Sequence, residues 1–131
     1  MGYYSELTNA NMDISKELIR DMTMALARFL LENKQIREWY GINESVLKND
    51  NIDVDELFES LGWGLDYDNE GNVDGMYTDP RKHYYELEIF NIIAPYVKAG
   101  SYLQMQGEDG DIWRWYFDGK HCVDKGMKWD D

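Results

Sequence analysis

The most prominent chemical feature of the sequence is a run of acidic side chains in its middle third. Eleven carboxylates lie between residues 44 and 79 against one cation, Lys48, so this segment supplies ten of the thirteen net negative charges of the 131-residue chain. The acidic residues of this block are Glu44, Asp50, Asp53, Asp55, Glu56, Glu59, Asp66, Asp68, Glu70, Asp74 and Asp79. Closely spaced like charges repel one another, which costs free energy unless water or a cationic partner offsets it.

Carboxylates arrayed along a helix and a neighbouring hairpin can imitate the charge and spacing of a phosphate backbone. A protein built this way can occupy the basic groove of a nuclease or another nucleic-acid-binding protein and exclude DNA from it. We assign this partner-binding role to the acidic residues from Glu44 to Asp74, with Tyr67 and Tyr77 as aromatic anchors. Such binding is steered by charge and weakened by salt. The alternative is that the block is only a solvated face.

Part of the block follows the spacing of a calcium-binding loop. Asp66, Asp68, Glu70 and Asp74 occupy the first, third, fifth and ninth positions of an EF-hand pattern, with glycine at the sixth. The twelfth position is Tyr77, where the motif requires a bidentate glutamate, and the flanking residues predict strands in place of helices. We therefore expect an acidic hairpin loop without a metal ion. A small calcium-dependent binding protein remains as an alternative.

Catalytic signatures are weak. His121 next to Cys122 suggests a nucleophile and its base, but neighbours on a strand point to opposite faces. Zinc requires a spaced set of ligands, whereas the chain holds one cysteine and two distant histidines, His83 and His121. The sequence predicts no catalytic residue, no metal site and no cofactor, and we expect that the protein is not an enzyme.

An aromatic stretch near the C-terminus has two interpretations. Trp113, Arg114 and Trp115, together with Tyr116 and Tyr102, combine rings and a cation in a way that suits stacking on bases or sugars. Strand alternation places the two tryptophans on one face and Arg114 and Tyr116 on the other. We favour core packing for the first face, and for Arg114 a structural position across a tyrosine ring or paired with an acidic residue of the preceding turn.

Periodicity and turn residues indicate the elements that position these side chains. Apolar residues at three- and four-residue steps predict a helix over 14–36, with Asp13 or Ser15 as its N-cap. A second helix is predicted over 54–61, opened by Asp53 and closed by Gly62, and a third over 82–97. Strands are predicted at 63–68, 73–78, 101–106, 111–117 and 120–124. Together they indicate an α+β fold in which a largely antiparallel sheet of about five strands is covered by helices.

Composition limits the class of protein. Residues 1–131 fit one domain, and 44% hydrophobic with 15% aromatic residues is enough to form a core. One cysteine excludes an internal disulfide and fits a reducing cytoplasm. No apolar run reaches the length of a membrane span, which is about 20 residues. A pI near 4.4 argues against direct binding of nucleic acid. The oligomeric state is left open.

One segment carries a resemblance. The turn Gly107-Glu108-Asp109-Gly110, followed two residues later by Trp113-Arg114-Trp115, resembles the C-terminal hairpin of small uncharacterised acidic proteins encoded by phages and mobile elements of Gram-positive bacteria. The resemblance covers roughly the last third of the chain and implies a genomic context and no active site. It favours an anti-defence role in the cytoplasm of a host cell, as an inhibitor of a CRISPR or restriction nuclease. The alternative is an accessory protein that self-assembles through exposed aromatic strands.

Overall fold

The computed structural model describes residues 4–126 of the chain. In chain order its elements are β1 (Tyr4–Asn11), α1 (Lys16–Glu32), α2 (Lys34–Trp39), α3 (Glu44–Leu47), α4 (Val54–Ser60), β2 (Gly64–Tyr67), β3 (Val73–Tyr77), β4 (Arg81–Lys82), α5 (Glu86–Ile93), the 3₁₀ helix η1 (Ala94–Tyr96), β5 (Tyr102–Gly107), β6 (Ile112–Phe117) and β7 (Cys122–Gly126).

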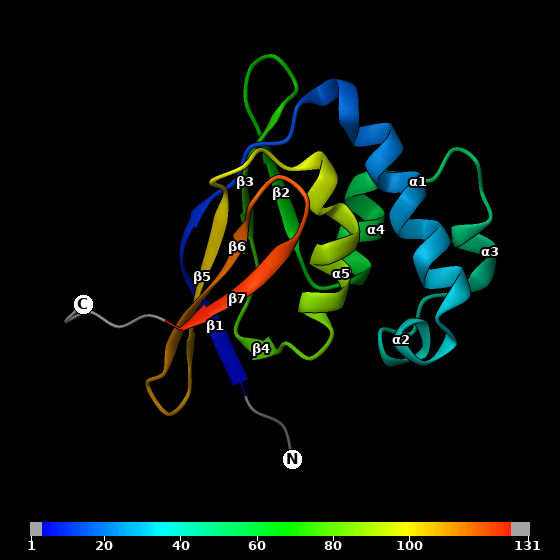
Figure 1. The fold of residues 1–131 in the computed structure, drawn as a ribbon. Coiled ribbons are helices and arrows are strands. Elements are labelled where there is room, and N and C mark those ends of the chain that lie inside the picture. The colour runs from blue at the N-terminus through cyan, green and yellow to red at the C-terminus, as the bar shows by residue number, and fades with distance from the viewer. Residues whose placement is uncertain (1–3, 127–131) are drawn as a thin grey trace.

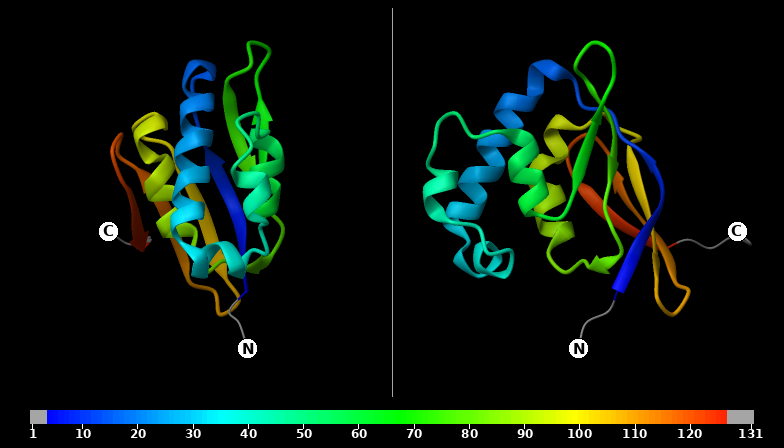
Figure 2. Two further views of the ribbon diagram at one scale, coloured as in Figure 1. Left: turned by 90° about the vertical axis from the view of Figure 1, so that its right-hand side faces the viewer. Right: turned by 180° about the vertical axis from the view of Figure 1, so that it is seen from behind.

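The strands form two antiparallel sheets. The larger sheet has five strands in the order β4-β1-β5-β6-β7, and β2 pairs with β3 in a separate hairpin (Figure 1). Helices α1 and α5 cover one face of the larger sheet, while α4 packs beside α1 and against β2 (Figure 2). This arrangement confirms the predicted α+β fold with a largely antiparallel sheet of about five strands covered by helices.

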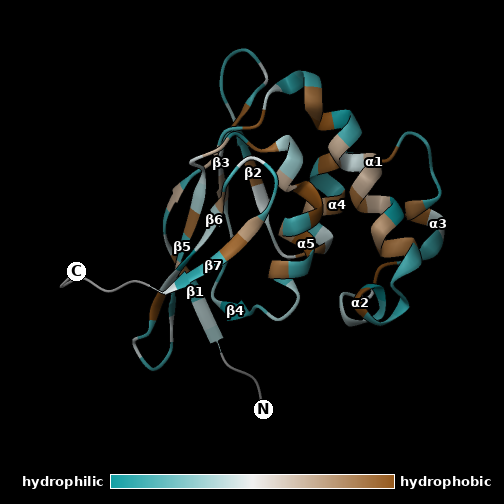
Figure 3. Ribbon diagram, viewed as in Figure 1, coloured by the Kyte–Doolittle hydropathy of each residue, from teal (hydrophilic) through white to brown (hydrophobic). Residues whose placement is uncertain are grey.

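The core lies between the helices and the larger sheet. Met22, Leu26 and Leu30 of α1 recur at a four-residue step and are all completely buried, as the period of a one-sided helix requires. On α5, Phe90 meets the sheet through Trp115, with the two ring centroids 5.4 Å apart in an edge-to-face arrangement. Figure 3 shows the hydrophobic segments of α1 and α5 alternating with hydrophilic ones, while the β2–β3 loop is hydrophilic.

The strand membership of the sheet differs from expectation. The predicted strands at 63–68 and 73–78 form the separate β2–β3 hairpin, and β1, for which no strand was predicted, lies between β4 and β5. The inward side chains of β1 are polar Ser5, apolar Leu7 and small Ala10, and an irregularity in register between Leu7 and Asn9 interrupts the two-residue period. The strand therefore lacks the alternating pattern by which strands are recognised.

Two helix predictions were too long. The helix predicted over 14–36 is two helices, because the chain leaves helical geometry at Asn33 (φ −123°, ψ 81°) between α1 and α2. The helix predicted over 82–97 begins at Glu86, because Arg81 and Lys82 pair with β1 as the short strand β4, and its last turn continues as the 3₁₀ helix that contains Pro95. Pairing between segments so far apart in sequence overrides local helix preference.

The other predicted elements lie within one or two residues of their expected bounds, while the short helix α3 was not predicted. Helix α4 spans Val54–Ser60 with Asp53 as its N-cap, and Gly62 follows it with φ +92°, a conformation that favours glycine. Strands β5, β6 and β7 form the predicted C-terminal meander. In residues 4–126 no helix has the length and apolar character needed to cross a membrane.

Candidate functional site

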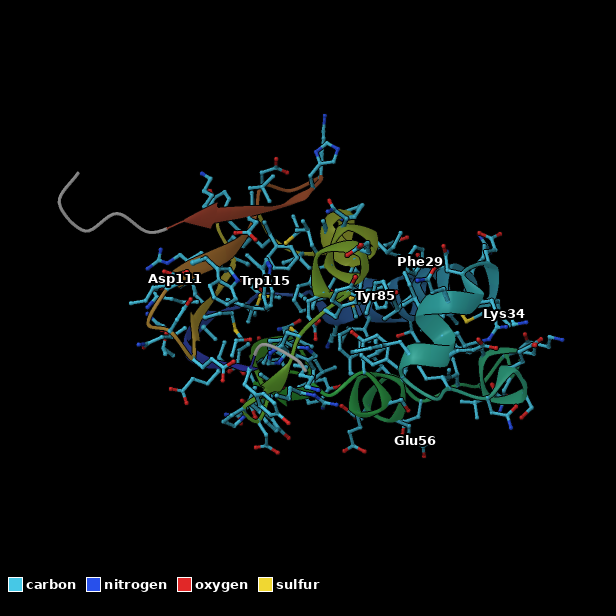
Figure 4. All side chains as sticks on the ribbon, turned by 90° about the horizontal axis from the view of Figure 1, so that it is seen from below. Phe29, Lys34, Glu56, Tyr85, Asp111 and Trp115 are labelled. Atoms are coloured by element: carbon cyan, nitrogen blue, oxygen red, sulfur yellow. The ribbon has the colours of Figure 1, made fainter. Side chains whose placement is uncertain are left out.

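Helix α4 carries its carboxylates outward. Asp53 accepts a hydrogen bond from the backbone N–H of Asp55 (3.0 Å), which satisfies one of the free donors at the helix start. Leu57 and Phe58 are buried, and this apolar stripe orients the helix so that Glu56 and Glu59 are exposed. Figure 4 shows the Glu56 side chain projecting away from the body of the molecule.

The β2–β3 hairpin carries a second group of carboxylates. Leu65, Val73 and Met76 face the core and are buried, whereas Asp66 and Asp74 are exposed along the strands. Since strand side chains alternate between faces, burying the apolar residues leaves the hairpin's carboxylates in solvent.

Asp68 organises the loop between these strands. Its carboxylate accepts hydrogen bonds from the backbone N–H of Glu70 (2.9 Å) and from the backbone N–H and side-chain amide of Asn72 (3.0 and 3.1 Å). The side-chain hydrogen bond from Asn72, with these backbone bonds, lowers the pKa of Asp68. Gly71 completes the turn at φ +91°. Asn72 in turn accepts a hydrogen bond from the backbone N–H of Lys16 (2.9 Å), which fastens the loop to the start of α1.

One hydrogen bond joins the helix to the hairpin. The Tyr67 hydroxyl donates to Asp55 Oδ1 at 2.8 Å, and α4 and the hairpin lie side by side when the molecule is viewed from behind (Figure 2, right). Burial, followed by the hydrogen bond to Asp55, raises the pKa of the Tyr67 hydroxyl, so it remains a donor at neutral pH. We call the carboxylates on these two elements the acidic surface; they are Asp53, Asp55, Glu56, Glu59, Asp66, Asp68, Glu70 and Asp74.

The acidic surface has no cationic partner within the described chain. Ion pairs occur elsewhere in residues 4–126, as between Lys98 and Asp13 (3.8 Å), and none of them includes a carboxylate of the acidic surface. Its carboxylates therefore act outward as a block of like charge, with Asp55 and Asp68 also holding the framework together.

Two predicted partner-binding residues lie outside this surface. Glu44, at the first position of α3, is 3.5 Å from both the Arg37 guanidinium and the Lys48 ammonium group, so its charge is compensated. Asp50 lies in the loop before α4. The structure thus separates Glu44 from the carboxylates of α4 and the hairpin, because α3 belongs to the α1–α2 side of the molecule (Figure 1).

Tyr77 lies at the far end of the hairpin from the loop. Its ring covers Gly64 on the paired strand, where an added side chain would collide with it, and it is 53% exposed. The ring lines a cavity of about 220 Å³ together with Glu59, Asp79 and Arg81. It is available for contact with a partner, although on a different part of the hairpin from Tyr67.

The residues weighed for metal and thiol chemistry are dispersed. No group of three or more histidine, cysteine or acidic side chains within residues 4–126 is arranged to hold a metal ion. Cys122 is buried, which raises the pKa of its thiol to about 12, whereas His121 is exposed with its Nδ1 3.9 Å from an Asp118 oxygen. A thiol with a raised pKa is a poor nucleophile.

The side chains of β6, the strand that contains Trp113 and Trp115, point to the two faces of the larger sheet. Trp115 is buried against Phe90 of α5, while Arg114 lies on the open face of the larger sheet with its guanidinium carbon 3.8 Å from the centre of the Tyr102 ring. Arg114 Nε donates to Gln104 Oε1 at 3.0 Å, so the cation is held between a ring and an amide. This is the structural position across a tyrosine ring that was predicted for Arg114.

Sequence analysis missed a buried polar cluster. Glu86 is 2% exposed, and its carboxyl group accepts hydrogen bonds from Trp63 Nε1 (3.2 Å) and the Tyr40 hydroxyl (3.3 Å). Burial raises the pKa of Glu86 to about 7 in spite of both donors. Tyr40, Trp63 and Glu86 come from three separate parts of the chain, and nothing in their local sequences indicates that they meet.

His83 extends this cluster toward the larger sheet. Its Nδ1 is 2.7 Å from Ser5 Oγ and its Nε2 is 3.3 Å from Thr78 Oγ1, while its ring lies between those of Trp63 and Trp115, at centroid distances of 5.6 and 6.2 Å. Burial, followed by the charge of Arg81, lowers the pKa of His83 to about 4. At neutral pH the imidazole is therefore uncharged.

Comparisons of the chain with protein-family models, with curated proteins and with solved structures find no match.

Proposed function

We propose that the protein binds the nucleic-acid-binding groove of a basic protein through its acidic surface and so excludes DNA. The observation that carries this proposal is the hydrogen bond between Tyr67 and Asp55, which joins α4 to the hairpin and so fixes the two elements that carry the carboxylates. Free side chains on separate elements would lose conformational entropy on binding, whereas carboxylates held on joined, packed elements lose less.

The charge balance supports the same proposal. A surface evolved for solubility alone intersperses both signs, whereas the acidic surface forms no ion pair within the described chain. The electrostatic field of carboxylates of one sign attracts a cationic groove over distances of about 10 Å at moderate salt and speeds association with the partner. Tyr67, 39% exposed within the field, adds an aromatic contact of the type common in interfaces.

The C-terminal resemblance supports a class of target. The turn at Gly107–Gly110 and the strand that follows it lie in the β5–β6 hairpin, far along the chain from the acidic surface. The resemblance to phage and mobile-element proteins favours a restriction or CRISPR nuclease of the host as the protein whose groove is occupied. The binding mechanism follows from charge and does not depend on which of these enzymes is the partner.

The test is capture of a partner followed by displacement. The tagged protein is incubated with a lysate of the cells that encode it at low salt, and bound proteins are eluted either with salt or with duplex DNA. We expect a DNA-binding protein that both salt and DNA release. Capture of proteins that salt releases but DNA does not would contradict competition for a groove.

A matched pair of variants links the result to the acidic surface. Asp53→Asn, Asp55→Asn, Glu56→Gln and Glu59→Gln together keep the helix cap and the acceptor for Tyr67 while removing four charges. The control removes four exposed charges elsewhere, with Glu6→Gln, Glu32→Gln, Glu88→Gln and Asp111→Asn. We expect the first variant to lose about a hundredfold or more in affinity and the control to lose about tenfold or less. Equal losses would show that net charge alone is responsible.

A further inference from the structure

One cavity differs in charge from the rest of the described chain, and Figure 1 shows the start of β1, α2 and β4, which contribute to its lining, at the lower end of the molecule. The cavity has a volume of about 340 Å³ and lies among the start of β1, the end of α2, the end of α4 and β4. The residues that line it are Tyr4, Trp39, Tyr40, Ser60, Arg81 and Lys82. Among the residues that the structure describes, the lining thus consists of two cations, three aromatic rings and a hydroxyl with no carboxylate, in a chain with twice as many acidic as basic residues. We call this cavity the aromatic pocket.

Arg81 indicates what kind of ligand fits. Its guanidinium occupies the space beside Gly62 that a side chain there would fill, so its position is set by the glycine. The side chain is partly buried, and it forms no hydrogen bond or ion pair with any residue in the described part of the chain. A partly buried guanidinium without acceptors is unfavourable, and an anion with two oxygens in a plane would satisfy it.

Trp39 supplies the second part of the site. Its side chain is 50% exposed although tryptophan is usually mostly buried. Tyr84 and Tyr85 hold it from one side, with ring centroids 5.4 and 6.0 Å away, and Figure 4 shows Tyr85 in the interior of the molecule. A large ring that is supported by neighbours and partly open to solvent is a surface on which a planar ligand can stack.

Tyr40 connects the pocket to the buried cluster. Its ring lines the pocket while its hydroxyl donates to Glu86, so the wall of the pocket is held in one orientation by a buried hydrogen bond. The ammonium nitrogen of Lys82 lies 5.9 Å from the centre of the Tyr4 ring, and both residues line the pocket. The pocket therefore has a wall in which Tyr40 is held by a buried hydrogen bond, and two cations in its lining.

We infer that the aromatic pocket binds a nucleoside monophosphate, with the base stacked on Trp39 and the phosphate on Arg81, while Lys82, which also lines the pocket, adds positive charge. The volume lies at the lower end of the range for small-molecule sites, about 300–1,000 Å³, which suits a mononucleotide. A single-stranded polymer is less favoured, because each added phosphate meets the field of a chain with a net charge of −13, and because Glu59 and Asp79 line the neighbouring cavity beyond Arg81.

Isothermal titration with adenosine monophosphate tests this inference. Adenosine and inorganic phosphate, titrated separately, show whether the ring and the anion are both needed; we expect each to bind at least about tenfold more weakly than the nucleotide. Absence of saturable binding for the four common nucleoside monophosphates at about 1 mM would overturn the inference. Tighter binding of a single-stranded oligonucleotide than of the mononucleotides would overturn it as well, in favour of a polymer site.

Variants assign the binding to the pocket. We expect Arg81→Gln and Trp39→Ala each to weaken binding about tenfold, while Arg28→Gln, which removes an exposed cation of α1, leaves it unchanged. Since Arg81 also contacts the region of Gly62, Lys82→Gln provides a second variant at an exposed position that does not disturb folding. Unchanged affinity in Trp39→Ala and Lys82→Gln would place the nucleotide elsewhere.

Discussion

The carboxylates of the acidic surface and the carboxyl group of Glu86 are the same chemical group in opposite surroundings. On α4 and the hairpin, water solvates the charged form, and each charge adds to a common field. Glu86, 2% exposed, has two neutral donors in place of water, and burial raises its pKa to about 7. Near neutral pH it is therefore partly protonated, although the formal charge of −13 counts it as ionised. The net charge of the protein therefore depends on the surroundings of its acidic residues as well as on their number.

This difference also separates two roles. Outside, the carboxylates are suited to attract a cationic partner, and their identity matters less than their number and arrangement. Inside, one carboxyl group connects α5 to Tyr40 after α2 and to Trp63 before β2, and its hydrogen bonds matter more than its charge. Replacing either kind of residue tests whether this division holds.

The largest effect is expected when Glu86 is removed entirely. Glu86→Ala leaves Trp63 Nε1 and the Tyr40 hydroxyl without acceptors in the interior and opens a cavity, so we expect a loss of at least about 3 kcal/mol in the free energy of unfolding. Glu56→Ala on the acidic surface is expected to change it by no more than about 0.5 kcal/mol. Urea denaturation measures both. Similar losses in the two variants would mean that Glu86 is not the structural carboxyl group described here.

The second prediction concerns pH. Since the pKa of Glu86 is raised from 4.5 to about 7 on folding, the unfolded chain ionises first, and this group lowers stability as pH rises through that interval. The expected loss is about 3 kcal/mol, complete above pH 7. Glu86→Gln cannot ionise and keeps an acceptor for Trp63, so the stability difference between wild type and variant should change by that amount between about pH 4.5 and 7.5.

The protonation of His83 changes the free energy of unfolding with pH in the opposite direction, and this contribution is common to wild type and Glu86→Gln. Its pKa is lowered from 6.5 to about 4, so the unfolded chain binds a proton first and stability falls as pH decreases through this interval. The difference between wild type and Glu86→Gln cancels this contribution because His83 is present in both. A pH-independent difference between the two proteins would show that folding does not raise the pKa of Glu86.

Sequence patterns predicted those parts of the fold that depend on local interactions. The N-cap at Asp53, the glycines after α4 and in the hairpin, and the turns of the C-terminal meander are each determined by a few adjacent residues. Strand β1 was missed because only Leu7 among its inward residues is strongly apolar and because its register is irregular. The division of the first helix at Asn33 and the pairing of β4 with β1 depend on tertiary contacts that no local pattern encodes.

The candidate site was predictable in composition and not in arrangement. The acidic residues were visible as a block, but the pairing of Glu44 with Arg37 and the contact between Tyr67 and Asp55 join residues whose meeting depends on how the helices pack. The Glu86 cluster was invisible, because a glutamate at the start of a helix normally indicates an exposed residue near the helix N-terminus. Here Trp63 and Tyr40 cover it instead.

A smaller effect is expected at the contact between α4 and the hairpin. Tyr67→Phe removes the hydroxyl that donates to Asp55 and keeps the ring, so we expect a loss of about 0.5 to 1 kcal/mol, modest because the site is partly exposed. Tyr77→Phe is the matched control, since the Tyr77 side chain packs over Gly64 and its hydroxyl forms no hydrogen bond with the described residues. Hydrogen exchange of the β2–β3 amides measures whether the hairpin loosens; equal exchange in both variants would mean that the contact does not hold it.

The smallest expected effect on stability tests whether the charges of the acidic surface repel one another without also making stabilising contacts. Glu56→Gln combined with Glu59→Gln removes like charges from the acidic surface without removing a hydrogen-bonded side chain of the framework, so we expect a gain on the order of a few tenths of a kcal/mol at low salt. Near 1 M salt, where screening acts within about 3 Å, this gain should disappear. The stability change in Glu86→Gln should persist there, because the buried group is screened little. A loss of stability in the double variant would instead show that these carboxylates make stabilising contacts, and that the acidic surface maintains the fold as well as presenting charge.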